Sequence, residues 1–172
     1  YGEELWIGHG FRTSMSSHHE VSEFLEMDYD RNVNSLLLIE PEFYHLDTCF
    51  CPLDRGHLLF YPKAFLDSDV KLFYEKFGKE NCIEVSEYDA KNFACNAISL
   101  DNKVVLNKAT DKLVYDLEEH GYSVYENDMS EFLLSGGSTK CSILHLDLPP
   151  AMETMEERIN STIDDIYRDR DD

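Results

Sequence analysis

The sequence predicts an α/β fold, or more loosely α+β, in which a strand–helix–strand module occurs about three times. Short apolar strand patterns begin at LWIG, HLLF and KVVL, near residues 5, 57 and 103. A loop, an amphipathic helix and a further strand follow each of them, at a period of roughly 50 residues. The alternative is an ordinary α/β domain with coincidental spacing. A chain of 172 residues is long enough for one domain with a substantial core.

The first module is expected to contain three elements: a strand at 5–7, a helix at 17–27 and a buried strand at 35–39. The helix is indicated by Val21, Phe24 and Leu25, which share one face and should pack on the core. Ser16 or Ser17 is the expected N-cap, because a serine hydroxyl can accept from a free N–H of the first turn.

The second module is expected to begin with a hairpin, which pairs a strand at 43–51 with a strand at 57–61. A helix at 67–77 follows, since apolar residues recur there at helical spacing, and a strand at 82–85 comes next. A short helix is expected at 87–93.

The third module begins with strands at 97–100 and 103–106 around Asp101-Asn102, a typical hairpin turn signal. A helix at 110–120 and a strand at 123–125 complete this module, and a helical turn is expected at 129–134. Beyond it, residues 149–172 carry apolar side chains at helical spacing among many acids, which predicts an acidic amphipathic helix as a C-terminal extension to a domain at 1–148.

Composition and charge narrow the classes of function. Apolar residues make up 42% and aromatic residues 12%, which favours a folded chain. The net charge of −20 argues against nucleic acid and an anionic membrane surface as partners, and is compatible with a small cationic ligand. The sequence has no long apolar run and no signal-peptide pattern. Five cysteines without regular spacing favour reduced thiols, and hence a cytoplasmic location.

Cys141 is the candidate nucleophile. It follows a flexible glycine turn in SGGSTKCSILHL and precedes an apolar strand pattern. A thiol at the mouth of a strand can meet a substrate while the strand holds it in place. The alternative is a buried strand cysteine, because free cysteine is among the most buried residue types.

The segment FYHLDTCFC carries the second candidate group. If it is a strand, alternation places His45, Asp47, Cys49 and Cys51 on one face. One interpretation is catalytic, with His45 as proton shuttle and Asp47 as anchor for a cation. A second is a zinc site formed by His45, Cys49, Cys51 and His57, although this spacing fits no common zinc motif. The third is a core histidine with satisfied hydrogen bonds beside a solvated aspartate.

Four segments together resemble the guanidino-group-modifying enzymes of the pentein superfamily: FYHLDTCFCPL, HLLFYPKAF, FACNAISLDNKVVLN and GYSVYENDMSEFLLSGGSTKCSILHL. These enzymes include dimethylarginine dimethylaminohydrolases, arginine deiminases and amidinotransferases, and in these motifs the chain most resembles the bacterial dimethylarginine dimethylaminohydrolase-like proteins. The His-Leu-Asp triplet, an Arg-Thr pair and Gly-Gly-x-x-x-Cys are the specific parts. The resemblance implies a partial αβ-propeller, in which three of five modules are present.

The resemblance also implies roles for individual residues. Cys141 matches the nucleophile and His45 the general acid/base. Asp47 matches the aspartate that binds the guanidinium, and Arg12 matches an arginine that binds the substrate carboxylate. No cofactor and no metal are implied. The remaining cysteines match no catalytic role and are expected to be packed thiols: Cys49, Cys51, Cys82 and Cys95.

The implied function is hydrolysis at the guanidinium carbon of arginine or methylated arginine. The reaction passes through a cysteine-bound thiouronium and gives citrulline and an amine or ammonia. The alternatives are amidino transfer to a second amine, or a non-catalytic binding module. The sequence begins at Tyr1, after the acidic segment that this family places before the first matching strand. We therefore expect an N-terminal part or another chain to complete the propeller.

Overall fold

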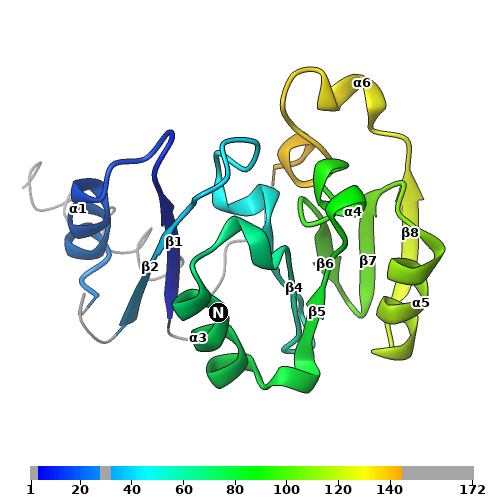
Figure 1. Ribbon diagram of the computed structural model, residues 1–172, viewed down its shortest axis with the longest axis horizontal. Coiled ribbons are helices and arrows are strands. Elements are labelled where there is room, and N and C mark those ends of the chain that lie inside the picture. Colours follow the sequence, from blue (N-terminus) through cyan, green and yellow to red (C-terminus); the bar gives the residue numbers. More distant parts are fainter. Residues whose placement is uncertain (1–3, 28–31, 145–172) are drawn as a thin grey trace, which may run out of the picture. The chain divides into compact units, whose positions relative to one another are not determined.

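Figure 1 shows the computed structural model of the chain, which describes residues 4–27 and 32–144. The chain divides into two units, Tyr1–Ser142 and Ile143–Asp172, and the elements described below belong to the first. The helix predicted at 149–172 lies outside the described residues.

The first module contains strand β1 (Leu5–His9), helix α1 (Ser16–Phe24) and strand β2 (Val33–Leu37). The two strands pair in parallel, with Leu5 opposite Val33 and His9 opposite Leu37, and form a two-stranded sheet. A parallel pair needs a crossover connection, and α1 lies in that connection.

The second module is a three-stranded sheet in the order β3-β4-β5. Strand β3 (Phe50–Pro52) runs antiparallel to β4 (Leu58–Phe60), and β4 runs parallel to β5 (Cys82–Glu84). Helix α3 (Asp67–Phe77) connects the parallel pair, with the bounds predicted from the sequence. The short helix α4 (Glu87–Lys91) follows β5.

The third module repeats this order as β6-β7-β8. Its strands are β6 (Ile98–Leu100), β7 (Lys103–Asn107) and β8 (Ser123–Asn127), and helix α5 (Asp111–Glu119) connects the parallel pair β7 and β8. The hairpin turn lies at Asp101-Asn102 as predicted, and both residues have positive φ. The single-turn helix α6 (Ser130–Leu133) comes last.

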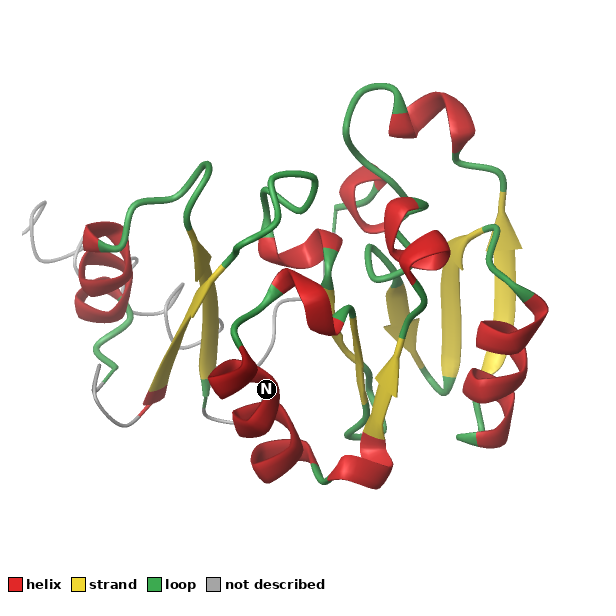
Figure 2. Ribbon diagram, viewed as in Figure 1, coloured by secondary structure: helices red, strands yellow, loops and turns green. Residues whose placement is uncertain are grey.

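Figures 1 and 2 show that each parallel pair has its own connecting helix: α1 for β1 and β2, α3 for β4 and β5, and α5 for β7 and β8. This arrangement confirms the predicted α/β class and the three strand–helix–strand modules. No helix within residues 4–27 and 32–144 is long and apolar enough to cross a membrane.

Aromatic side chains dominate the core near the second module. The ring of Phe73 on α3 lies 5.1 Å from that of Phe50 and 5.3 Å from that of Phe60, measured between centroids. Trp6 of β1 reaches the same cluster, 5.3 Å from the Phe50 ring. These contacts bury the inner face of α3 and join β1 to the second sheet, which fixes one wall of the cavity described below.

Three sequence predictions for these modules are wrong. Residues 43–51 do not form one strand, because Leu46–Thr48 is a 3₁₀ turn and only Phe50–Pro52 joins the sheet. In α1 the buried residues are His18 and Ser22, whereas Phe24 is 69% exposed. The N-cap position is Met15, without a side-chain hydrogen bond. His18 faces inward because the neighbouring strands offer its ring hydrogen-bond partners, whereas the Ser22 hydroxyl donates to the His19 carbonyl of the same helix.

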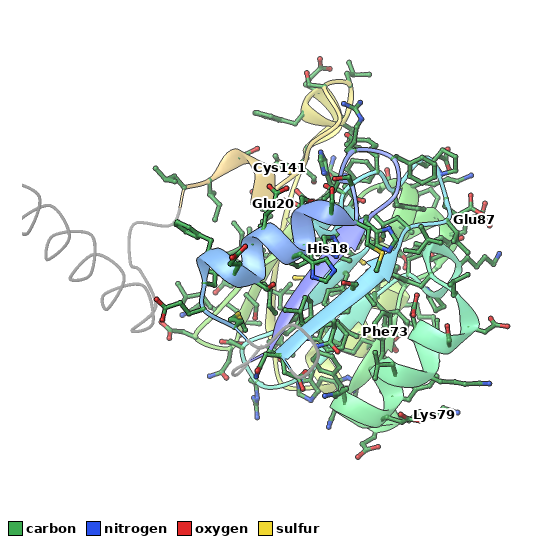
Figure 3. All side chains as sticks on the ribbon, turned by 90° about the vertical axis from the view of Figure 1, so that its left-hand side faces the viewer. His18, Glu20, Phe73, Lys79, Glu87 and Cys141 are labelled. Carbon is green, nitrogen blue, oxygen red and sulfur yellow. The ribbon has the colours of Figure 1, made fainter. Side chains whose placement is uncertain are left out.

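His18 supplies those hydrogen bonds between α1 and the first sheet (Figure 3). The ring is fully buried, with Nδ1 2.8 Å from the Ser35 hydroxyl and Nε2 3.3 Å from the Gly8 carbonyl oxygen. A carbonyl can only accept, so the neutral ring carries its proton on Nε2. Burial lowers the pKa of His18 below its ordinary value of 6.5, and repulsion from His9 and His19 acts in the same direction.

We expect the free energy of unfolding to fall as the pH drops below about 6.5, because the unfolded chain then binds a proton that folded His18 resists. Above that pH the His18 contribution is fully present. Urea midpoints at pH 7.5 and 5.5 measure the effect. His18→Gln should flatten the pH dependence, whereas His19→Gln, at an exposed position of the same helix, should leave most of it. Equal slopes for the parent chain and His18→Gln would contradict this assignment.

Candidate active site

One cavity of about 690 Å³ brings together side chains that lie far apart in the sequence. His45 and Asp47 line it from the turn before β3, and Cys141 lines it from the segment after α6. Glu4 and Lys140 are the other charged residues at its wall. The cavity therefore contains a thiol, an imidazole and a carboxylate, which is the combination the sequence predicted for nucleophilic chemistry.

The turn that carries His45 and Asp47 is held by Thr48. The Thr48 backbone N–H donates to the His45 carbonyl at 3.1 Å, and its hydroxyl donates to the same oxygen at 2.6 Å. Thr48 is itself buried. Leu46, between these two polar residues, packs against the core. A Cβ added at Gly8 would lie only 3.0 Å from the Leu46 Cβ, so β1 passes close to the turn at this glycine. The turn thus fixes His45 and Asp47 on the cavity side.

Cys141 lies in a second 3₁₀ turn, Lys140–Ser142, rather than at the start of a strand. It is exposed, so the buried alternative does not hold (Figure 3). Gly136, which precedes this turn, has a φ of +80°, and a Cβ there would overlap the Tyr44 hydroxyl. That hydroxyl donates to the Gly136 carbonyl. A glycine is therefore required where the loop meets Tyr44.

The Cys141 sulfur has two polar neighbours. The thiol donates to Asp47 Oδ2 at 3.6 Å, and the side-chain amide of Asn96 donates to Sγ at 3.2 Å. Sγ therefore lies between a charged acceptor and a neutral donor. A cation bound to Asp47 would neutralise the charge of the acceptor and leave the Asn96 hydrogen bond in place.

Arg12 does not line the cavity, although its neighbour Thr13 does. The guanidinium of Arg12 lies 5.3 Å from the centroid of the Tyr44 ring, which is a cation–π geometry. The structure thus brings three of the four predicted site residues to one cavity and places the fourth on the loop beside it.

The remaining cysteines are packed in or against the core. Burial raises the pKa of the Cys49, Cys51 and Cys95 thiols, and raises that of half-buried Cys82 to about 11. Among the described residues, no group of three or more His, Cys, Asp or Glu could hold a metal ion. His57, the fourth ligand of the zinc alternative, instead lies with Nδ1 2.8 Å from the Tyr122 hydroxyl.

Sequence reasoning missed two residues of this site. Alternation along a strand would turn Tyr44 away from His45 and Asp47, but its hydroxyl contacts the loop before Cys141. The resemblance implies no role for Asn96, although it is fully buried and donates to the sulfur. The available signal was an amide side chain within the apolar run FACNAI, since a buried amide needs partners.

The comparisons with known proteins found curated relatives, although no family model matches the chain. The chain is 43% identical over 148 residues to the bifunctional arginine dihydrolase/ornithine cyclodeaminase AgrE of Nostoc sp.. This match covers 86% of the chain and 20% of AgrE. The chain is 36% identical over 145 residues to the N(G),N(G)-dimethylarginine dimethylaminohydrolase of Mycobacterium tuberculosis, and this match covers 84% of the chain and 46% of the relative.

A solved structure of an arginine dihydrolase domain also matches the chain. The N-terminal domain of ArgZ, a cyanobacterial arginine dihydrolase crystallised with its product, superposes with a TM-score of 0.80 at 41% identity. The match covers 86% of this chain and 53% of the ArgZ domain chain. The chain therefore spans about half of the domain it matches. The chain is 43% identical to AgrE and 36% identical to the dimethylarginine dimethylaminohydrolase. This corrects the expectation that proteins like the dimethylarginine dimethylaminohydrolases are the more similar ones.

We expect iodoacetamide to alkylate Cys141 more than about tenfold faster than any other cysteine at pH 7.5, because the reactive species is an accessible thiolate. Cys82 has the next best access, but its raised pKa leaves little thiolate at this pH. Mass spectrometry of tryptic peptides after short labelling measures each site. Cys141→Ser should lose the fast phase and Cys82→Ser should keep it. Comparable labelling of Cys82 and Cys141 would contradict the assignment.

Proposed function

We propose that the chain belongs to the pentein superfamily and that it carries the thiol, imidazole and carboxylate of an arginine-hydrolysing active site. The observation that supports the proposal is the shared cavity of Cys141, His45 and Asp47. The similarity to two arginine dihydrolases supports arginine as the substrate class.

Asp47 is proposed to bind the substrate guanidinium. A carboxylate can accept two parallel hydrogen bonds from a guanidinium, which fixes the plane of the group as well as its charge. The 3.6 Å separation of Asp47 Oδ2 from Cys141 Sγ then brings the guanidinium carbon close to the sulfur. Binding also neutralises the charge of Asp47, so the thiolate forms more easily when substrate is present.

The proposed reaction has two stages. The Cys141 thiolate attacks the guanidinium carbon and a C–S bond forms. His45 then donates a proton to the departing nitrogen, the C–N bond breaks and ammonia leaves, which gives a thiouronium on Cys141. In the second stage His45 takes a proton from water and the hydroxide attacks the same carbon. The C–S bond then breaks, the hydroxyl proton passes to solvent, and citrulline and the thiolate are released.

Arg12 is proposed to bind the substrate carboxylate. It lies on the loop next to cavity-lining Thr13 and stacks on Tyr44, which keeps its guanidinium near the cavity mouth. A methylated arginine is the second candidate substrate, because the 36% identical M. tuberculosis relative is a dimethylarginine dimethylaminohydrolase. Citrulline is the product in both cases, so the amine that is released distinguishes them.

A further part of the domain is proposed to complete this site. The chain spans 53% of the ArgZ N-terminal domain chain, and the exposed side chain of Phe24 on α1 offers an apolar contact for the remainder. The remainder is proposed to come from an N-terminal part or from another chain.

The first test mixes the chain with the N-terminal half of the ArgZ domain and measures citrulline and ammonia from arginine. We expect release from the mixture and little from the chain alone. Cys141→Ser should reduce release roughly 10³-fold or more, because no thiolate can attack. Cys82→Ser, outside the cavity, should remain active. An active Cys141→Ser mixture would overturn the proposal, and brisk release from the chain alone would overturn the need for completion.

The second test concerns Asp47→Asn in the same mixture. Loss of a charge-assisted pair with the guanidinium should raise KM for arginine about tenfold or more. Asp101→Asn is the matched control, since Asp101 lies in the exposed β6–β7 turn and asparagine tolerates its positive φ. Initial rates over a range of arginine concentrations separate KM from kcat. An unchanged KM in Asp47→Asn would remove Asp47 from the binding site.

A further inference from the structure

Asn96 joins the two reactive segments of the chain through a fully buried side chain. Its Nδ2 donates to Cys141 Sγ and to the backbone carbonyl of Asp47, both at 3.2 Å. Its Oδ1 accepts from the backbone N–H groups of Ser138 and Cys141, also at 3.2 Å. Its backbone carbonyl accepts from the Lys140 N–H at 3.0 Å.

We propose that Asn96 is the positioning residue that holds the Cys141 sulfur at the cavity and favours its thiolate form. The inference deepens the proposed function, and rests on it, because it presumes that the sulfur of Cys141 is the nucleophile. All the side-chain contacts of Asn96 described above go to the turn that carries Asp47 or to the loop that carries Cys141. The amide therefore sets the position of one segment against the other.

The chemistry of the amide suits this position. An N–H that donates to sulfur stabilises a thiolate more than a thiol, since the acceptor then carries the full charge. Around the cavity the charged and titratable neighbours of the sulfur are Asp47, Glu4, His45 and Lys140. Of these, the Asp47 carboxylate lies within hydrogen-bond distance of Sγ and opposes the thiolate. Asn96 acts against this effect without adding a charge that would compete for a cationic substrate.

An amide of this length can donate to Sγ and also accept from the two backbone N–H groups. Aspartate has the same shape and could still accept from the two backbone N–H groups, but it offers no donor to Sγ or to the Asp47 carbonyl. Its charge would also repel the thiolate and the Asp47 carboxylate. Asn96→Asp therefore removes the proposed electrostatic effect while it keeps most of the packing.

The test follows the alkylation rate of Cys141 by iodoacetamide between pH 6 and 10, with mass spectrometry of the Cys141 peptide. This readout needs no turnover and uses the full 172-residue chain. In Asn96→Asp we expect the rate at pH 7.5 to fall about tenfold or more, and the pH of half-maximal rate to move upward by about one unit or more.

Asn107→Asp is the matched control. Asn107 is also a buried amide of the third module, and its Nδ2 donates to the Asn92 carbonyl at 2.9 Å while its Oδ1 accepts from the Met129 N–H at 3.0 Å. It therefore loses the same kind of donor, but contacts neither Cys141 nor Asp47 in these bonds. We expect its alkylation profile to match that of the parent chain, even if its stability falls.

Asn96→Ser removes the donor to Sγ without adding a charge, so a shifted profile in both Asn96→Ser and Asn96→Asp, with an unshifted one in Asn107→Asp, supports the proposal. A folded Asn96→Ser chain with the parent profile overturns it, as does an equal shift in Asn107→Asp. Circular dichroism checks folding, and if Asn96→Ser does not fold, Asn96→Ala decides by the same measurement. Citrulline release in the completed domain is scored separately, so a shifted profile without turnover would overturn the proposed function and leave the role of Asn96 supported.

Discussion

The hydrogen bonds of the buried Asn96 amide hold together two segments that have no sheet in common. His45 and Asp47 lie on a turn closed by Thr48, and Cys141 lies on a 3₁₀ turn after α6. Neither turn has a strand ladder to fix it, so a few side-chain bonds set the relative positions of the sulfur, the carboxylate and the imidazole. Since a buried amide that loses its partners costs about 1–3 kcal/mol, these bonds also resist the opening of the site.

The repeat of the fold was predictable because its signals are local. A parallel pair requires a crossover helix, and the helix of the second module, Asp67–Phe77, is marked by apolar residues at helical spacing. The face of α1 was not predictable in this way. Its pattern favours Phe24 as an inward residue, but His18 faces inward because Gly8 and Ser35 on the two strands offer it partners. Tertiary hydrogen bonds of this kind have no local pattern.

The site was predictable in its residue types and not in its geometry. Alternation over 43–51 favoured a strand that displays His45 and Asp47 together, and the structure displays them together on a turn instead. Both residues line the cavity from that turn, so strand alternation is not what places them on one side. Asn96 and Tyr44 were missed since both act across long sequence separations, through a single amide and a single hydroxyl.

The described contacts of the thiol come from Asp47 and Asn96, and those of its loop from Tyr44 and Asn96. All of these residues belong to the unit Tyr1–Ser142. Reactivity of Cys141 therefore depends on bonds that this chain makes by itself, whereas the proposed turnover of arginine also depends on groups that bind the rest of that molecule. The two properties are physically separable, and a chain that spans about half of a relative's domain can hold its proposed nucleophile in place without enclosing the proposed substrate.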